Sequence, residues 1–169
     1  MDFQVPEELA IQSRQMRRLI EKDMTRVERE TCDGEELKPE WRPTFEMRAK
    51  ELGIWMMDVP KQYGGLGMLL MASVIVWEEL ARKIALPSYG NGITGTSVRE
   101  ILYDLDVDMK ERYLHPVLRG EKKTCFAQTE PDAGSDPGLM RTTAVHHGDH
   151  YLVNGVKRFI TGAEKTDFI

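Results

Sequence analysis

The chain has 169 residues and a mass of 19.4 kDa, enough for one ordinary domain or one and a fraction. Hydrophobic residues make up 41% and charged residues 30%, a globular composition that excludes disordered, collagenous and low-complexity chains. The net charge is −5 and the basic residues are scattered, which argues against nucleic acid as a partner.

The first predicted element is a long helix that begins at Pro6. Glu7 and Glu8 follow the proline, and carboxylates complement the positive end of a helix dipole. Apolar residues then recur at helical spacing on one side, which predicts a core-facing stripe. The stripe consists of Leu9, Met16, Leu19, Ile20, Met24 and Val27.

A second helix is predicted over Glu40–Leu52, with Trp41 and Phe45 on it and Gly53 as its C-terminal stop. The stretch Pro60–Gly67 is rich in turn residues and interrupts the helical pattern. The first part of the chain is therefore predicted to be helices joined by short loops.

Three more helices complete this helical part. Dense apolar residues over Leu69–Ile84 predict a helix buried on most of its sides. Pro87–Tyr103 and Val107–Arg119 follow, and the second of these is predicted to be interrupted or kinked at Pro116, because proline lacks an amide donor.

After Gly120 the apolar pattern changes from a helical period to alternation by two. This change predicts an α+β fold with an all-α domain over 1–121 and the beginning of an antiparallel β domain over 122–169. The predicted strands are Thr124–Gln128, Met140–His147, and a hairpin of His150–Val153 and Val156–Thr161 on the turn Asn154-Gly155. A further turn is expected at Gly148-Asp149, between the second strand and the hairpin.

Three stretches carry a family resemblance, which covers essentially the whole chain. Tyr63–Gly67 reads YGGLG, Thr129–Asp136 reads TEPDAGSD and Asn154–Thr161 reads NGVKRFIT. In order and spacing these stretches resemble the acyl-CoA dehydrogenase family. Departures from its commonest pattern are Asp132, Phe159 and Gly162, where glycine, tryptophan and asparagine are frequent.

The resemblance implies an FAD enzyme with a helical domain, a central β domain and a C-terminal helical bundle. Such an enzyme oxidises an acyl-CoA thioester to trans-2-enoyl-CoA and passes hydride to FAD, and an electron-transferring flavoprotein reoxidises the flavin. It further implies fatty acid metabolism and a homo-oligomer, dimer or tetramer, for the full-length protein. An acyl-CoA oxidase, which differs in electron acceptor, is the alternative enzyme class.

The resemblance also assigns site residues in the β part. Backbone amides and a hydroxyl at a strand end suit the polar edge of a flavin, and aromatic rings suit its apolar part. Gly134 allows close approach of a pyrophosphate, and Ser135 is assigned to both cofactor and substrate. The implied cofactor residues are Phe126, Gln128, Thr129, Gly134, Ser135, Phe159, Ile160 and Thr161.

The acidic residues of the second motif require another role, since carboxylates repel phosphate. Glu130, Asp132 and Asp136 are predicted to be paired or to act as caps, and Glu130 is not predicted to be the catalytic base. The resemblance places that base in the C-terminal bundle, so no catalytic residue is predicted in this chain. We expect the chain to be a fragment, with a natural short subunit as the alternative.

Other patterns favour structural roles over further sites. Gly90–Gly95 satisfies GxGxxG, yet no convincing strand precedes it. No metal site is predicted at the turn that carries His146, His147 and His150, because adjacent strand residues point to opposite faces. Cys125 is interpreted as a small buried residue.

The expected compartment is the cytoplasm, with no membrane as partner. The longest apolar run, Met68–Trp77, is about half the length of a bilayer span, and the acidic N-terminus does not resemble a secretory signal or transit peptide. Cys32 and Cys125 lie far apart, which fits a reducing environment. A non-catalytic helical scaffold is the alternative function for the isolated chain.

Overall fold

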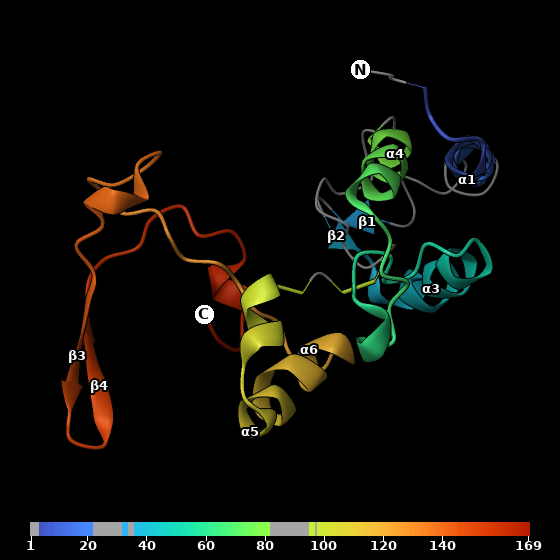
Figure 1. Cartoon of the computed structure of the whole chain (residues 1–169). Coiled ribbons are helices and arrows are strands. Elements are labelled where there is room, and N and C mark those ends of the chain that lie inside the picture. The colour runs from blue at the N-terminus through green and yellow to red at the C-terminus, as the bar shows by residue number, and fades with distance from the viewer. Residues whose placement is uncertain (1–3, 22–31, 34–35, 82–94, 97) are drawn as a thin grey trace. The chain divides into compact units, whose positions relative to one another are not determined.

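The computed structural model describes residues 4–21, 32–33, 36–81, 95–96 and 98–169 (Figure 1). The chain divides into two compact units, Met1–Val98 and Arg99–Ile169. Helices dominate the first unit, and the second combines helical turns with a β-hairpin. The α+β class is thereby confirmed, whereas the domain division at 121/122 stays a prediction.

Helix α1 spans Glu7–Leu19 and starts where the sequence predicts, after Pro6. Its described stripe faces inward, since Met16 and Ile20 are 1% and 2% exposed. Carboxylates occupy its first turn and arginines its last, the distribution that the helix dipole favours. The predicted continuation through Met24 and Val27 lies outside the described residues.

The predicted second helix is observed in two parts. A 3₁₀ turn, Pro39–Trp41, leads directly into α3, Arg42–Glu51. The helix ends at Glu51 with Leu52 as its C-cap, and Gly53 adopts the left-handed conformation with φ +65°, as a C-terminal glycine does. A short antiparallel pair, β1 (Cys32–Asp33) and β2 (Glu36–Leu37), precedes it and was not predicted.

Helix α4, Leu70–Leu80, covers most of the predicted Leu69–Ile84, whose last three residues lie outside the described part. Its burial differs from the prediction. Val76 is fully buried, but Leu70, Met71 and Val74 are 80%, 55% and 51% exposed. The helix is apolar around its circumference, and the described chain packs against only one of its sides.

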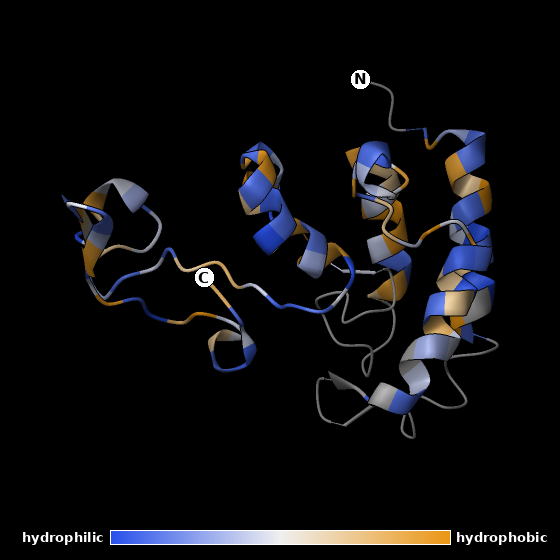
Figure 2. Ribbon diagram, turned by 90° about the horizontal axis from the view of Figure 1, so that it is seen from below, coloured by the Kyte–Doolittle hydropathy of each residue, from blue (hydrophilic) through white to orange (hydrophobic). Residues whose placement is uncertain are grey.

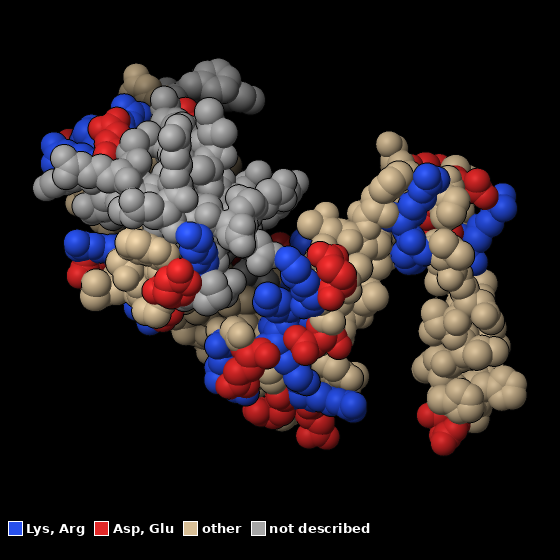
Figure 3. All heavy atoms as spheres, turned by 180° about the vertical axis from the view of Figure 1, so that it is seen from behind, with Lys and Arg blue, Asp and Glu red and all other residues tan. Residues whose placement is uncertain are grey.

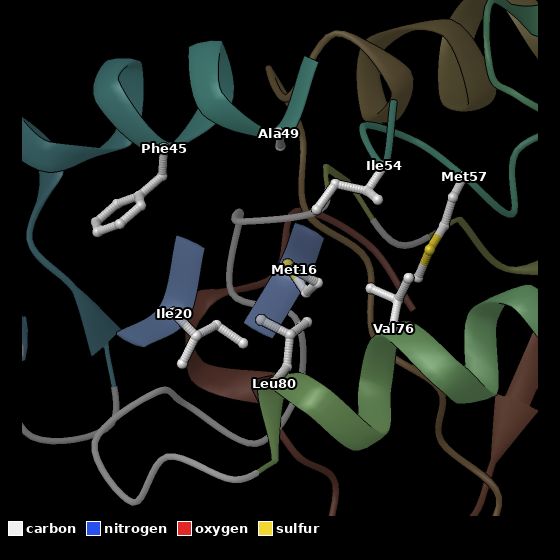
Figure 4. Close-up of a cluster of buried hydrophobic side chains, with 8 residues drawn as sticks. All are labelled: Met16, Ile20, Phe45, Ala49, Ile54, Met57, Val76 and Leu80. Carbon is white, nitrogen blue, oxygen red and sulfur yellow. The ribbon is translucent and has the colours of Figure 1, made fainter. Parts of the chain in front are cut away.

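The core of this unit lies between α1, α3 and α4 (Figure 4). Apolar side chains from these three helices and from the loop after α3 meet there. Figure 2 shows by colour that hydrophobic and hydrophilic residues both occur along the helices of this unit. The cluster consists of Met16, Ile20, Phe45, Ala49, Ile54, Met57, Val76 and Leu80.

A buried carboxylate joins α1 to α4. Arg17 donates to both oxygens of Glu79, from Nη2 at 2.6 Å and from Nε at 3.0 Å, and Ser13 donates at 2.9 Å. The Glu79 side chain is 3% exposed, so this pairing satisfies a charge that burial would otherwise penalise. Sequence reasoning missed it, because the partners lie more than 60 residues apart.

The YGGLG stretch is a compact loop in which two glycines have different reasons to be glycine. Gly64 adopts φ +86°, and nothing lies within 4 Å of a Cβ built on it. A Cβ on Gly65 would lie 2.1 Å from the carbonyl oxygen of Val59. The first glycine is required for its conformation and the second for close backbone approach.

This difference predicts unequal costs of substitution. Gly65→Ala is expected to lower the free energy of unfolding by about 2–3 kcal/mol, because the Val59 backbone must shift. Gly64→Asn is the control, since asparagine tolerates left-handed φ and meets open space, and it should cost under about 1 kcal/mol. Urea unfolding followed by tryptophan fluorescence measures both, and equal losses would contradict the assignment.

In the second unit, the predicted helix Val107–Arg119 is realised in three consecutive pieces. They are α5 (Val107–Met109), a π-helical turn (Lys110–Leu114) and α6 (His115–Leu118). Proline at 116 cannot donate to the carbonyl of Arg112, four residues earlier, and Lys122 Nζ donates to that carbonyl at 3.4 Å instead. The interruption predicted at Pro116 is thus observed just before it.

The predicted helix Pro87–Tyr103 is wrong over its described part. Residues 95–96 and 98–99 are not helical, and Glu100–Asp104 forms a 3₁₀ turn. The rest of that prediction, and the GxGxxG string up to residue 94, lie outside the described residues.

The β-hairpin of this unit turns at Gly148-Asp149, where a turn is predicted, but the second predicted hairpin is absent. Strands β3 (Thr143–His147) and β4 (His150–Asn154) pair antiparallel across Gly148-Asp149, with Thr143 opposite Asn154. The predicted hairpin on Asn154-Gly155 is wrong, and Val156–Thr161 is not a strand. Thr124–Gln128 is not a strand either, because only Thr124 forms a bridge, to Phe168.

Candidate functional site

Two motif segments that are separate in the sequence come together in the second unit. The amide of Arg158 donates to the carbonyl oxygen of Thr129 at 2.8 Å. Lys157 Nζ donates to the carbonyl oxygen of Gln128 at 3.1 Å. The stretch 128–130 and the stretch 157–158 therefore lie side by side, which brings Gln128 and Thr129 next to the segment that leads into Phe159.

The aromatic candidates are open to solvent. Phe126 is 59% exposed, and the Arg99 guanidinium lies 5.7 Å from its ring centre. Phe159 is 80% exposed, and the Arg158 guanidinium lies 4.7 Å from its ring centre. Each ring therefore presents accessible apolar surface, which is suited to cover part of a planar ligand.

Phe159 also has an unusual backbone. Its φ of +58° is rare for a bulky residue and indicates local strain, which is concentrated at functional positions. Phe159 and Thr161 do not share one face of a strand, because this segment, predicted to be a strand, is irregular. Thr161 is exposed and Ile160 is half-buried.

Polar candidates of the second motif are accessible as well. Gln128 and Thr129 are half-buried, while Gly134 and Ser135 are exposed. Nothing lies within 4 Å of a Cβ built on Gly134, so the described chain itself does not require glycine there. Accessible hydroxyls and amides are the kinds of donor that a flavin with a pyrophosphate requires.

Glu130 lies at the centre of this region and is the most buried carboxylate in it, with a side chain 5% exposed. It accepts hydrogen bonds from Lys157 Nζ at 2.9 Å, from the amide of Arg141 at 2.6 Å and from the amide and hydroxyl of Thr142. The lysine above all, then Thr142 and Arg141, holds the pKa of Glu130 at about 2. A carboxylate paired in this way is a poor proton acceptor.

The predicted structural roles of the motif's acidic residues are confirmed. Asp136 accepts from the Gly138 amide at 2.8 Å and caps the 3₁₀ turn Pro137–Leu139. Asp132 lies 3.3 Å from Arg141. Sequence reasoning required partners for these carboxylates but did not identify Lys157, which lies 27 residues after Glu130.

The low pKa of Glu130 predicts a pH dependence with a definite sign. The group is ionised more readily when folded, so its stabilising contribution is complete above its ordinary pKa of 4.5 and is lost as pH falls toward 2. Glu130→Gln should flatten the fall in stability between those values.

The measurement is the urea midpoint at a series of pH values, followed through the Thr142 amide signal by NMR. Glu164→Gln, a change at an exposed position of the same unit, serves as the control and should retain the wild-type profile. An unchanged profile in Glu130→Gln would refute the linkage.

The hairpin histidines and Cys125 have structural surroundings. His147 and His150 stack across the hairpin with ring centres 5.9 Å apart, and Cys125 is buried. Within the described residues, no three metal-ligand side chains gather in one place. No described helix combines the length and apolarity needed to cross a bilayer.

Comparison with known proteins identifies the class of this chain. Residues 6–121 match the N-terminal domain of the acyl-CoA dehydrogenases, and residues 125–169 match their middle domain. The chain belongs to the acyl-CoA dehydrogenase family.

Named relatives include reductases as well as dehydrogenases. The chain is 44% identical over 121 residues to "3-(aryl)acrylate reductase" of Clostridium sporogenes, which covers 69% of this chain and 31% of that protein. It is 38% identical over 152 residues to "Caffeyl-CoA reductase-Etf complex subunit CarC" of Acetobacterium woodii, covering 89% and 39%. The chain thus spans less than half the length of these relatives.

A solved structure has a similar fold. The glutaryl-coenzyme A dehydrogenase in complex with glutaryl-CoA superposes with a TM-score of 0.67 at 30% sequence identity. The match covers 100% of this chain and 43% of that one. Family membership therefore rests on both sequence and fold.

Proposed function

We propose that the complete polypeptide carrying these residues is an FAD-dependent acyl-CoA dehydrogenase, and that this chain supplies part of its cofactor and acyl-CoA sites. The observation that carries the proposal is the junction between the two motif segments, where the Arg158 amide meets the Thr129 carbonyl. Around it the chain presents exposed aromatic rings and polar donors. Its cytoplasmic location, homo-oligomeric state and place in fatty acid metabolism are parts of the same proposal.

Each candidate residue has a task that its chemistry allows. Thr129 and nearby amides would hydrogen-bond the polar edge of the ring system, while Phe126 and Phe159 would cover its apolar parts. Gly134 and Ser135 would approach the pyrophosphate, with Ser135 also near the thioester. Bound FAD supplies the hydride acceptor that side chains lack. No residue of this chain is assigned as the catalytic base.

A second candidate is the reverse reaction, reduction of the double bond of an α,β-unsaturated acyl-CoA. The names of the two relatives above favour it, since both are reductases and one belongs to an Etf complex. An electron-transferring flavoprotein is the proposed redox partner in either direction. Acyl-CoA oxidase stays an alternative that differs in electron acceptor.

The test uses the purified complete polypeptide and its absorption spectrum. A yellow protein whose flavin band is bleached anaerobically by a saturated acyl-CoA supports the dehydrogenase. Reoxidation of the reduced protein by an enoyl-CoA, with no bleaching by the saturated thioester, favours the reductase. A colourless folded protein that takes up no added FAD would overturn both and leave the scaffold alternative.

A further inference from the structure

We propose that Glu130 and Lys157 are positioning residues, which hold the two halves of the candidate flavin site in register. The inference rests on the proposed function, because it concerns the placement of residues around the same flavin. Neither side chain is assigned to contact the cofactor. Their role is to fix the backbone that carries Gln128, Thr129 and Phe159.

The Lys157 ammonium joins three segments. It donates to the Gln128 carbonyl oxygen at 3.1 Å and to Glu130 Oε1 at 2.9 Å, and it lies 3.6 Å from Met140 Sδ. Its side chain is 25% exposed, so its long stem is largely covered. The next residue, Arg158, donates its amide to the Thr129 carbonyl. Lys157 thus anchors the segment that leads into Phe159.

The Glu130 carboxylate fixes the opposite side of the junction. One of its oxygens accepts from the Arg141 amide and the other from Thr142, immediately before β3. Its own backbone is closed by reciprocal hydrogen bonds with Ala133, at 2.9 Å and 3.3 Å. The carboxylate therefore connects the TEPDAGSD turn to the base of the hairpin.

Gly155 provides independent support for a defined register at this point. A Cβ on Gly155 would lie 2.1 Å from Thr142 Oγ1, the hydroxyl that donates to Glu130. The backbone two residues before Lys157 therefore passes directly against a member of the same network. Any larger residue at 155 would displace Thr142 and with it the carboxylate.

The energetics favour positioning over simple stabilisation. A buried ion pair contributes little net stability compared with apolar residues of similar size, because desolvation offsets the attraction, but it prescribes one geometry. Phe159 keeps its positive φ only if neighbouring contacts enforce it. The Lys157–Glu130 pair and the Arg158–Thr129 hydrogen bond are contacts that hold the backbone immediately before Phe159.

The test compares Lys157→Met, Lys157→Arg and the double variant Glu130→Gln/Lys157→Met in the complete polypeptide. The double variant contains no unpaired buried charge, so it should fold even where the single variant does not. Lys123→Met is the matched control, because Lys123 is exposed and contacts Asp167 through its backbone. FAD affinity and the visible circular dichroism of bound flavin are measured.

We expect Lys157→Met and the double variant to bind FAD at least ~10-fold more weakly, with a changed visible dichroism spectrum. Lys157→Arg should restore the spectrum in part, and Lys123→Met should match the wild type. A double variant with wild-type affinity and spectrum would overturn the positioning role alone. A wild-type polypeptide that takes up no FAD would overturn the proposed function, and the positioning role in flavin placement with it.

Discussion

The complete polypeptide carrying both Thr129→Val and Thr161→Val is expected to reduce its flavin on the order of 100-fold more slowly than the wild type. Valine keeps the shape of threonine but removes the hydroxyl that can donate to the cofactor. Both positions are accessible, Thr129 half-buried and Thr161 exposed, so the loss should fall on the reaction and not on folding. Stopped-flow absorbance after mixing with acyl-CoA measures it.

Thr143→Val is the control for this experiment. Thr143 is exposed at the start of β3 and belongs to neither motif, so its replacement should leave the reaction rate unchanged. Equal rates in the wild type and the double variant would show that these hydroxyls do not serve the cofactor. In that case the assignment of Thr129 and Thr161 fails, even if the polypeptide is a flavoprotein.

Met16→Ala should produce the largest loss of stability in the helical unit, about 2–5 kcal/mol. Met16 is 1% exposed and packs in the cluster between α1, α3 and α4, where its removal leaves a cavity. Met47→Ala is the matched control, because Met47 is 52% exposed on α3.

Chemical unfolding followed by tryptophan fluorescence measures this loss of stability in the helical unit. Trp41 and Trp55 pack against the cluster, and Trp77 lies on α4. The control should cost well under about 1 kcal/mol. Equal midpoints for the two variants would mean that the cluster is not the core of this unit.

The helices were predictable because local signals and core packing agree. Pro6 opens α1, Gly53 ends the second helix, and the described apolar stripe of α1 faces the cluster. The exposed side of α4 was not predictable, since composition reports how apolar a helix is and not which neighbours cover it.

The hairpin shows why local turn signals are ambiguous. Turns are predicted at both Gly148-Asp149 and Asn154-Gly155, because both are good turn dipeptides flanked by alternating residues. Only the first turn forms, and β4 ends at Asn154, opposite Thr143. Gly155 is needed instead for its close approach to Thr142, a contact that no local pattern reveals.

The candidate site was predictable by motif but not by geometry. The resemblance directed attention to both segments, and the structure brings them together at Thr129 and Arg158. The roles of individual residues within those segments stay predictions. Lys157, which organises the junction, is separated from Glu130 by 27 residues, and a pairing at that distance leaves no signal in a single sequence.

The β3–β4 hairpin has a practical consequence for handling the protein. Every residue of both strands is exposed, and between Thr143 and Asn154 the sequence carries one formal charge, at the turn, as the tan surface with its acidic tip shows in Figure 3. Bare strand edges with apolar side chains and little repulsion template intermolecular cross-strand pairing. Dilute storage at moderate pH, and a lysine introduced at Val145, are the direct means of keeping preparations of these 169 residues monodisperse.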